Sequence, residues 1–353
     1  MPYGVLIMNK PKVLFIVDVE GWAYDDQAKN WQELLSEYNI DIMYLNNYKV
    51  YTYKLVNPTS PMKYNKSVIP QRLKFVFDKQ GVFNDQLFDH NDYNAIVIFY
   101  SRGLQDSRIK VTDLGKDKTI ICINNEKWRQ EKSLKQFYKT YLESATIITG
   151  CNDTIKKRFE PYCNIFKVSQ NVNPTLFNIN RKYIVRSNRS TKEDFIVGWS
   201  GNPKAHNGLK NYNTIRKICQ EAGVKLSVRT NVSREELAKW YNCIDAVLCC
   251  SISEGGPMML LEAGACAVPI ITTNVGLVPE IIKHEQNGLI ISSDPGKIIH
   301  EGVQMINKLI SNLKLREQLA LNLHNEIIKN WTYQSKIYEI KNVLKKIITN
   351  ENI

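Results

Sequence analysis

The chain has 353 residues, in which 47 Lys and Arg exceed 35 Asp and Glu to give a formal charge of +12. This length favours about two domains, and 43% apolar with 23% charged residues excludes disordered and collagen-like proteins. The longest apolar runs, such as residues 94–100, are far shorter than the roughly 18–20 residues of a membrane span. The first residues lack a basic stretch followed by a cleavage site, so we expect no signal peptide.

The chain contains eight cysteines and five histidines, and neither set has the spacing of a metal site. No Cys-x-x-Cys pair occurs and the histidines are scattered, so we expect no structural zinc and no other metal. Several cysteines lie in apolar runs, which favours buried free thiols over disulfides. We therefore expect a reducing, cytoplasmic location.

The first half of the chain alternates apolar runs with helical patterns. Lys12–Val19 is a continuous apolar run bounded by Pro11 and Gly21, as expected of a parallel strand buried on both faces. A helix near Asp25–Tyr38 follows. Further strands are expected at Ile40–Leu45, Ala95–Tyr100, Thr119–Ile123, Ala145–Thr149 and Ile165–Val168. Residues 46–70, with two closely spaced prolines, are expected to form a loop that helps to shape an acceptor site.

The second half repeats this alternation after a polar, basic stretch, Asn178–Asp194, which fits an interdomain linker. Strands are expected at Phe195–Ser200, Val224–Arg229, Ala246–Cys250, Val268–Thr272 and Leu289–Ile291. Helices are expected near Asn211–Glu221, Arg234–Tyr241, Met258–Ala265, Val278–Lys283, Gly296–Ile310, Lys314–Asn330 and Tyr333–Asn350. This pattern predicts two doubly wound α/β domains with a ligand cleft at the carboxyl ends of their sheets.

The stretch after the third strand of the second half carries the chemistry. Glu254 follows the strand, and Gly255-Gly256-Pro257 opens a helix whose free amides attract an anion such as a diphosphate. Glu262 lies about two turns along the same helix, so both carboxylates can face one cleft. Carboxylates accept hydrogen bonds from the hydroxyls of sugars and of ribose. Taken alone, a pair at this spacing favours a helix cap at Glu254 and a solvated Glu262, and it is the setting of the pair that favours a ligand site.

This acidic motif resembles that of the retaining, family-4 glycosyltransferases of GT-B fold, in the run Ser253-Glu-Gly-Gly-Pro-Met-Met-Leu-Leu-Glu262 and the segments Val268-Pro-Ile-Ile-Thr-Thr273 and Asn287-Gly288-Leu289. Other segments are similar to the same family: Val197–Asn202, Trp240-Tyr241-x3-Asp245, and Asn171-Val-Asn173 with Phe177. The resemblance covers residues 145–340 well and residues 12–45 weakly.

The resemblance implies transfer of a hexose or N-acetylhexosamine, with retention, from a UDP- or GDP-linked sugar to a hydroxyl of a glycan, lipid or protein. It implies no metal and no cofactor besides this donor substrate. Glu254 is expected to contact the sugar and Glu262 the ribose. Backbone amides near the diphosphate are expected from Gly255, Gly256, Met258, Met259 and Leu260.

The resemblance also implies two Rossmann-like domains facing across a cleft. The N-terminal acceptor domain is expected at 1–182, joined by a terminal helix at 335–353 that crosses back to it. The C-terminal donor domain is expected at 190–334.

The chain departs from the family at the basic group that neutralises the leaving diphosphate. Asn202 stands where the family commonly has Arg, so Lys204 or Lys210 is expected to supply this charge near the donor. Lys210 resembles the family lysine better, because an aromatic residue follows it, and it is our predicted catalytic cation beside Glu254.

The N-terminal domain retains less of the family pattern. Of the family's glycine-rich donor loop only Gly21 remains, next to Trp22. The family histidine has no counterpart after Thr119–Ile123. Trp22, Arg102 and Glu126 are therefore our candidates for the acceptor site.

Three other hypotheses remain open at this point, two of them alternatives to a transferase and one a transferase placed on an anionic surface. An epimerase or hydrolase of the same fold shares the nucleotide contacts but needs acid and base groups that the sequence does not reveal. A non-catalytic nucleotide-sugar-binding relative is consistent with the departures from the family. The basic stretch 154–192, with nine Lys and Arg and one acid, also suits peripheral contact with an anionic membrane, or with DNA, which is the less favoured partner.

Overall fold

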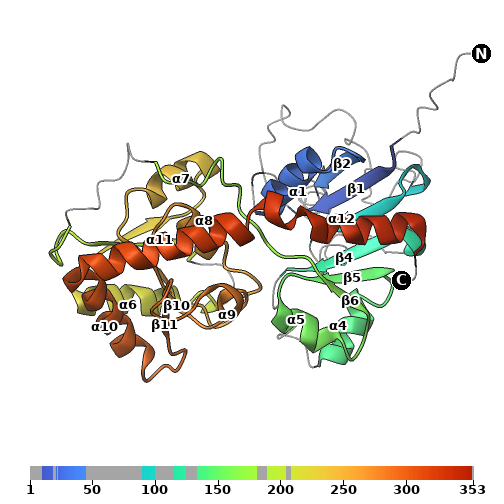
Figure 1. The fold of residues 1–353 in the computed structure, drawn as a ribbon. Helices are drawn as coiled ribbons and strands as arrows, with labels where there is room; N and C mark the ends of the chain where they lie inside the picture. The colour runs from blue at the N-terminus through green and yellow to red at the C-terminus, as the bar shows by residue number, and fades with distance from the viewer. Residues whose placement is uncertain are drawn as a thin grey trace, which may run out of the picture. The chain divides into compact units, whose positions relative to one another are not determined.

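The computed structural model describes residues 10–18, 21, 23–44, 90–99, 115–124, 133–180, 189–203 and 208–351. The chain divides into two compact units, each built on a parallel β-sheet (Figure 1). Unit 1 comprises Met1–Gly150, Arg158–Lys167 and Ile337–Ile353, and unit 2 comprises Cys151–Lys157 and Val168–Lys336.

Unit 1 contains a six-stranded sheet with strand order β2-β1-β3-β4-β5-β6 in the described residues, and all its pairings are parallel. Its strands are β1 (Lys12–Val17), β2 (Asn39–Tyr44), β3 (Ala95–Ile98), β4 (Thr119–Ile123), β5 (Ile147–Gly150) and β6 (Ile165–Lys167). The first strand is buried along almost its whole length, as its continuous apolar run predicts. Phe15 packs edge-on against Trp31 and Phe99 in this core.

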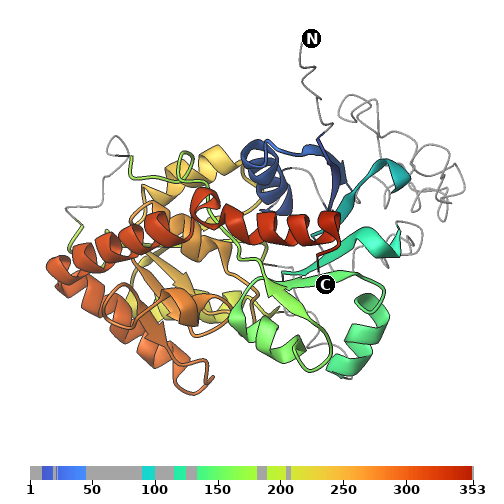
Figure 2. The same cartoon turned by 45° about the vertical axis from the view of Figure 1, so that its right-hand side comes forward.

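The helices of unit 1 include α1 (Ala23–Leu34) and α4 (Leu134–Tyr141), while α5 (Asp153–Phe159) belongs partly to each unit. Ser133 caps α4 by accepting a hydrogen bond from the amide of Gln136. Two short 3-10 helices, His90–Asp92 and Lys116–Lys118, precede β3 and β4. The helix α12 (Tyr333–Thr349) ends in unit 1, where Figure 2 shows its last turns in red.

Unit 2 contains a five-stranded parallel sheet with strand order β11-β10-β9-β7-β8. Its strands are β7 (Ile196–Ser200), β8 (Lys225–Arg229), β9 (Ala246–Cys249), β10 (Ile270–Thr273) and β11 (Leu289–Ile291). Its helices are α6 (Tyr212–Ala222), α7 (Arg234–Tyr241), α8 (Met258–Ala265), α9 (Val278–Ile281), α10 (Ile298–Ser311) and α11 (Leu313–Asn330). The predicted fold class, two doubly wound α/β domains, is confirmed.

The expected domain bounds differ from the observed units in two segments before residue 182. Cys151–Lys157 and the residues from Val168 onward belong to unit 2, although we expected the N-terminal domain to extend to residue 182. Backbone pairing ties the second segment to unit 2, because the amide of Val172 donates to the carbonyl of Trp331 at 3.0 Å and the amide of Tyr333 donates to the carbonyl of Val172 at 3.3 Å. The first segment is tied to unit 2 by the Asn152 side chain, whose Nδ2 donates to the carbonyl of Gly255 at 2.5 Å.

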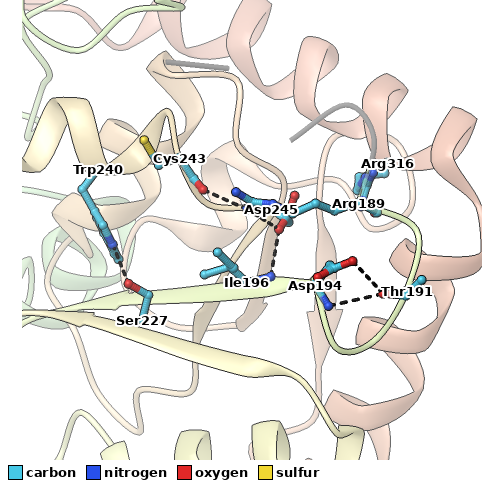
Figure 3. Close-up of polar contacts among 9 residues, drawn as sticks. All are labelled: Arg189, Thr191, Asp194, Ile196, Ser227, Trp240, Cys243, Asp245 and Arg316. Atoms are coloured by element: carbon cyan, nitrogen blue, oxygen red, sulfur yellow. Dashed lines mark hydrogen bonds and ion pairs between the residues drawn. The ribbon is translucent and has the colours of Figure 1, made fainter. Parts of the chain in front are cut away.

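A buried ion pair anchors the start of unit 2's central strands (Figure 3). Asp245 is 1% exposed and accepts hydrogen bonds from Arg189 Nη1 at 2.9 Å and from the amide of Ile196 at 2.8 Å. Arg316 donates to the carbonyl of Arg189 at 3.0 Å, which ties α11 to the same cluster. Burial raises the pKa of the Asp245 carboxyl, and the hydrogen bonds from Ile196 and Arg189 only partly oppose this shift.

All eight cysteines are free, and six of them are buried, as expected. No helix in the described part of the chain is both long and apolar enough to span a bilayer.

Candidate functional site

Polar residues of unit 2 gather where neighbouring parallel strands end. Ser251 follows β9, and Thr273 is the last residue of β10. The Thr273 hydroxyl donates to the carbonyl of Ser251 at 2.6 Å, and the Ser251 hydroxyl donates to Glu254 Oε1 at 2.8 Å. Glu254 is only 9% exposed, so this loop holds its carboxylate in a defined position.

Lys210 and Glu254, the two predicted catalytic residues, form an ion pair in which Lys210 Nζ lies 2.5 Å from Glu254 Oε1. The two loops are also joined through their backbones, since the amide of Ile252 donates to the carbonyl of Leu209 at 2.8 Å. Burial lowers the pKa of Lys210, but the charge of Glu254 and its hydrogen bond outweigh this and raise the pKa above its ordinary value. The ammonium is therefore fully charged at neutral pH.

Two glycines of this loop region, Gly256 and Gly276, have close neighbours where a Cβ would stand. A Cβ on Gly256 would lie 2.1 Å from Gln170 Oε1, and one on Gly276 would lie 2.5 Å from the carbonyl oxygen of Gly255. Asn152 Nδ2 donates to that same carbonyl at 2.5 Å. Glycine is thus required by close approach, and Gly276 also has a φ of 58°.

The helix α8 begins directly after this loop, with Pro257 as its N-cap and no side-chain cap. The amide of Leu260 donates to the carbonyl of Pro257 at 2.8 Å, so it is already used within the chain. Our expectation that the amides of Met258, Met259 and Leu260 face an anion stays a prediction, and the Leu260 amide also bonds within the helix. The side chain of Met259 is buried, so this residue offers a ligand only its backbone.

Glu262 is 2% exposed, so the alternative that it lies on a solvated face is wrong. Arg234 Nη1 lies 2.5 Å from its Oε1, and the Tyr241 hydroxyl donates to its Oε2 at 2.8 Å. The hydroxyls of Ser200 and Tyr241 are 3.0 Å apart, and the Arg234 guanidinium lies 4.7 Å from the ring centre of Phe177. Burial and the negative charge of Glu262 raise the pKa of Tyr241 far above its ordinary value.

Of the remaining predicted residues, Asn202 and Gly21 lie in the part of the chain that the structure describes. Asn202 is exposed and follows β7, at the same end of unit 2's sheet. Gly21 lies in unit 1, where its φ of 77° fits a turn and its amide donates to Asp25 Oδ2 at 2.7 Å. The other four candidates lie outside the described residues: Lys204, Trp22, Arg102 and Glu126.

Sequence reasoning missed Asn152, Gln170 and Arg234, and it gave Tyr241 no role. Asn152 follows β5, and its side chain also accepts a hydrogen bond from the amide of Ile155 at the start of α5. A polar residue after a parallel strand is the one signal that points to it.

The arrangement combines two carboxylates, each paired with a cation, and the uncapped start of a helix between them. Such a set binds hydroxyls through the carboxylates and a phosphate through the amides and Lys210. Within the described ranges, no cluster of three or more His, Cys, Asp or Glu is placed to hold a metal ion.

Comparison with known proteins finds similarity to one family over the part of the chain that holds Lys210, Glu254 and Glu262. Residues 193–325 match the model of the family described as glycosyl transferases group 1. An uncharacterized glycosyltransferase of Methanocaldococcus jannaschii is 29% identical over 133 residues, which cover 37% of this chain and 33% of that protein. The UDP-Gal:alpha-D-GlcNAc-diphosphoundecaprenol alpha-1,3-galactosyltransferase of Escherichia coli is 21% identical over 254 residues, which cover 66% of this chain and 61% of that protein. The chain thus spans between a third and three-fifths of the length of these two relatives.

Solved structures with the same fold cover almost the whole chain. Sucrose-phosphate synthase from Thermosynechococcus elongatus has a TM-score of 0.69 at 13% identity and covers 97% of this chain and 100% of its own. Anabaena HepE in complex with UDP and glucose has a TM-score of 0.64 at 11% identity and covers 95% and 100%. These likenesses confirm the predicted GT-B fold.

Proposed function

We propose that this chain, whose residues 193–325 match the group 1 glycosyltransferases and whose fold is GT-B, transfers a sugar from a nucleotide-diphosphate sugar to a hydroxyl acceptor. The observation that carries the proposal is the buried pair of carboxylates, Glu254 and Glu262, on either side of the uncapped N-terminus of α8. In finer detail we propose a UDP- or GDP-linked hexose donor, retention at the anomeric carbon, and no requirement for a metal.

Each part of the site suits one part of the donor. Glu254 accepts hydrogen bonds from hydroxyls of the transferred sugar, and Glu262 accepts them from the ribose. The amides of Met258 and Met259 donate to the diphosphate, which the positive end of the helix dipole also attracts.

Lys210 is the group that stabilises the leaving diphosphate. Its ammonium has three N–H donors, and Glu254 engages one at 2.5 Å. The others can meet the negative charge that develops on the diphosphate as the glycosidic C–O bond breaks. Stabilisation of the leaving group, more than a strong base, is what an ion-pair-like transition state with retention demands. An acceptor that is a glycan, lipid or protein supplies the attacking hydroxyl.

Calorimetric titration of UDP, GDP and UDP-sugars in the presence of a chelator tests this proposal. We expect one nucleotide to bind with micromolar affinity, about −8 kcal/mol, and Glu262→Ala to abolish that binding. Glu235→Ala, which removes an exposed carboxylate from α7, is the control and should bind as the wild type does. Failure of every nucleotide to bind would overturn the donor-site assignment. Binding without turnover over an acceptor screen would indicate a non-catalytic relative, the alternative that Asn202 in place of the family arginine favours.

A further inference from the structure

We propose that Arg234 and Tyr241 are positioning residues that hold the Glu262 carboxylate in the orientation needed for ribose, and that they thereby set a preference for ribonucleotides over 2′-deoxyribonucleotides. This inference rests on the proposed function, because it concerns the same donor site.

The two residues act from one face of α7. They stand at the first and last positions of that helix, about two turns apart, so their side chains project in the same direction. Arg234 binds one oxygen of Glu262 at 2.5 Å and Tyr241 binds the other at 2.8 Å. A carboxylate has about four acceptor positions, so each oxygen keeps an acceptor position for a ligand hydroxyl while its plane is fixed. Vicinal 2′- and 3′-hydroxyls can then be bound together, one on each oxygen.

The position of Arg234 argues that its charge serves Glu262 and not its own helix. It is the first residue of α7, where the helix dipole disfavours a cation. The start of this helix is already satisfied by a capping box between Ser233 and Glu236. This cost is offset because the Glu262 carboxylate, which is 2% exposed, needs a cation close by. The ring of Phe177, 4.7 Å below the guanidinium, supports the guanidinium plane.

Tyr241 completes the arrangement from inside the core. The residue is fully buried, and the Ser200 hydroxyl lies 3.0 Å from its own. Its raised pKa keeps the phenol protonated, so it always acts as a donor toward Glu262. The pairing of Arg234 with Glu262 also determines the net charge near a bound donor. With Arg234 beside it, Glu262 presents its acceptor oxygens without adding net negative charge near a bound diphosphate.

The test compares affinities for UDP and 2′-deoxy-UDP, or for the guanine pair where GDP binds the wild type more tightly. A residue needed only for folding weakens both nucleotides alike, whereas a positioning residue changes their ratio. We expect the wild type to prefer the ribonucleotide by about tenfold or more, the worth of one hydrogen bond to a charged group. Arg234→Gln and Tyr241→Phe should reduce this preference to about threefold or less, and Arg234→Lys should restore part of it.

Lys239→Gln removes one positive charge from the exposed face of the same helix and should keep the wild-type ratio. Tyr241→Phe retains the buried ring, so it tests the inference even if the Arg234 variants do not fold. A wild type that binds no nucleotide overturns the proposed function. A wild type that binds both nucleotides equally, or folded variants that keep the full preference, overturns the inference while leaving the donor site in place.

Discussion

At the scale of single residues, each buried carboxylate of unit 2 has its own cation, and the partners come from different elements. Glu254 in the loop after β9 pairs with Lys210 before α6, and Asp245 pairs with Arg189. Burying a carboxylate without a partner costs several kcal/mol, so removal of the cation alone is more damaging than replacement of both groups. These pairs therefore act as units in any mutational experiment.

Lys210→Met should lower kcat by about 10²–10³, because the leaving diphosphate loses its neutralising charge. KM for the donor should change much less than kcat, since the charge develops mainly in the transition state. Steady-state transfer kinetics measure both constants. Lys217→Met on the exposed face of α6 is the matched control. An unchanged kcat in the Lys210 variant would contradict this role.

The stability contributed by Asp245 should increase as the pH falls. Burial raises the pKa of this carboxyl in the folded protein above its ordinary value of 3.8, so the folded state takes up a proton before the unfolded chain does. Between those two pKa values acidification stabilises the folded wild type, whereas Asp245→Asn has no such titration. The difference in free energy of unfolding, wild type minus variant, should thus grow as the pH is lowered toward 3.8.

Urea denaturation at a series of pH values measures this difference. Glu235→Gln, which alters an exposed carboxylate on α7, provides the comparison. If the difference in free energy of unfolding between wild type and Asp245→Asn became smaller on acidification, the ion pair with Arg189, and not desolvation, would determine the pKa of Asp245.

At the scale of elements, the helix α8 is held against α11 at a glycine. A Cβ on Gly264 would lie 2.7 Å from Ile327 Cγ1 and 3.0 Å from Leu323 Cγ. Both neighbours are fully buried, so they have little room to give way. The close approach of these two helices keeps α8 in register with the site at its N-terminus.

Gly264→Val should therefore destabilise the protein by about 1–3 kcal/mol through overpacking. Gly264→Ala should cost less, because the gain in helix propensity, about 1 kcal/mol, offsets part of the clash. Chemical denaturation measures both variants. Gly296→Ala is the control, since its Cβ would meet only Asp294 Oδ1 at 3.4 Å. A Val variant as stable as the wild type would show that α11 can move away.

The elements themselves were largely predictable, and the reason is the parallel sheet. Strands buried on both faces appear as uninterrupted apolar runs, so β1, expected at Lys12–Val19, is found at Lys12–Val17. The helix α8 has the predicted bounds, Met258–Ala265, because Pro257 marks its start. The strand expected at Val268–Thr272 begins later, at Ile270, since Ala267 has a φ of 51° and occupies a turn.

Pairs of site residues could be predicted only where both residues lie within one helix or loop. Glu254 and Glu262 share one short segment, so their joint use follows from helical periodicity. Arg234 and Glu262 are 28 positions apart, and Asn152 and Gly255 are 103 apart. Such pairs come together through the order of the strands, about which a single sequence carries no direct signal.

At the scale of the whole molecule, the last helix belongs to the fold of the first unit. The part of α12 assigned to unit 1 buries four apolar side chains: Ile340, Val343, Leu344 and Ile347. Lys341 on this helix also pairs with Glu37 at 2.5 Å. The last turns of α12 therefore belong to the same unit as β1 and contribute buried side chains to it.

Ile340→Ala combined with Leu344→Ala should destabilise unit 1 by several kcal/mol, at about 2–5 kcal/mol for each truncation. Hydrogen exchange should show faster exchange of the amides of β1 and β3 with little change in β9 and β10. Tyr338→Ala, at a side chain that is 52% exposed, is the control on the same helix. Equal acceleration in both sheets would show that the two units unfold together.

The hydrogen bond from Asn152 to Gly255 has a consequence for recombination between relatives. Cys151–Lys157 is encoded in the first half of the gene, yet it packs with unit 2 and supports a loop encoded far downstream. A chimaera with a single crossover near residue 185 takes this hydrogen-bond donor from one parent and its acceptor from the other. Hybrids that also exchange Cys151–Lys157 and Val168–Asn180 keep the pair from one parent, and these are the hybrids expected to retain the nucleotide preference of the parent that supplies unit 2.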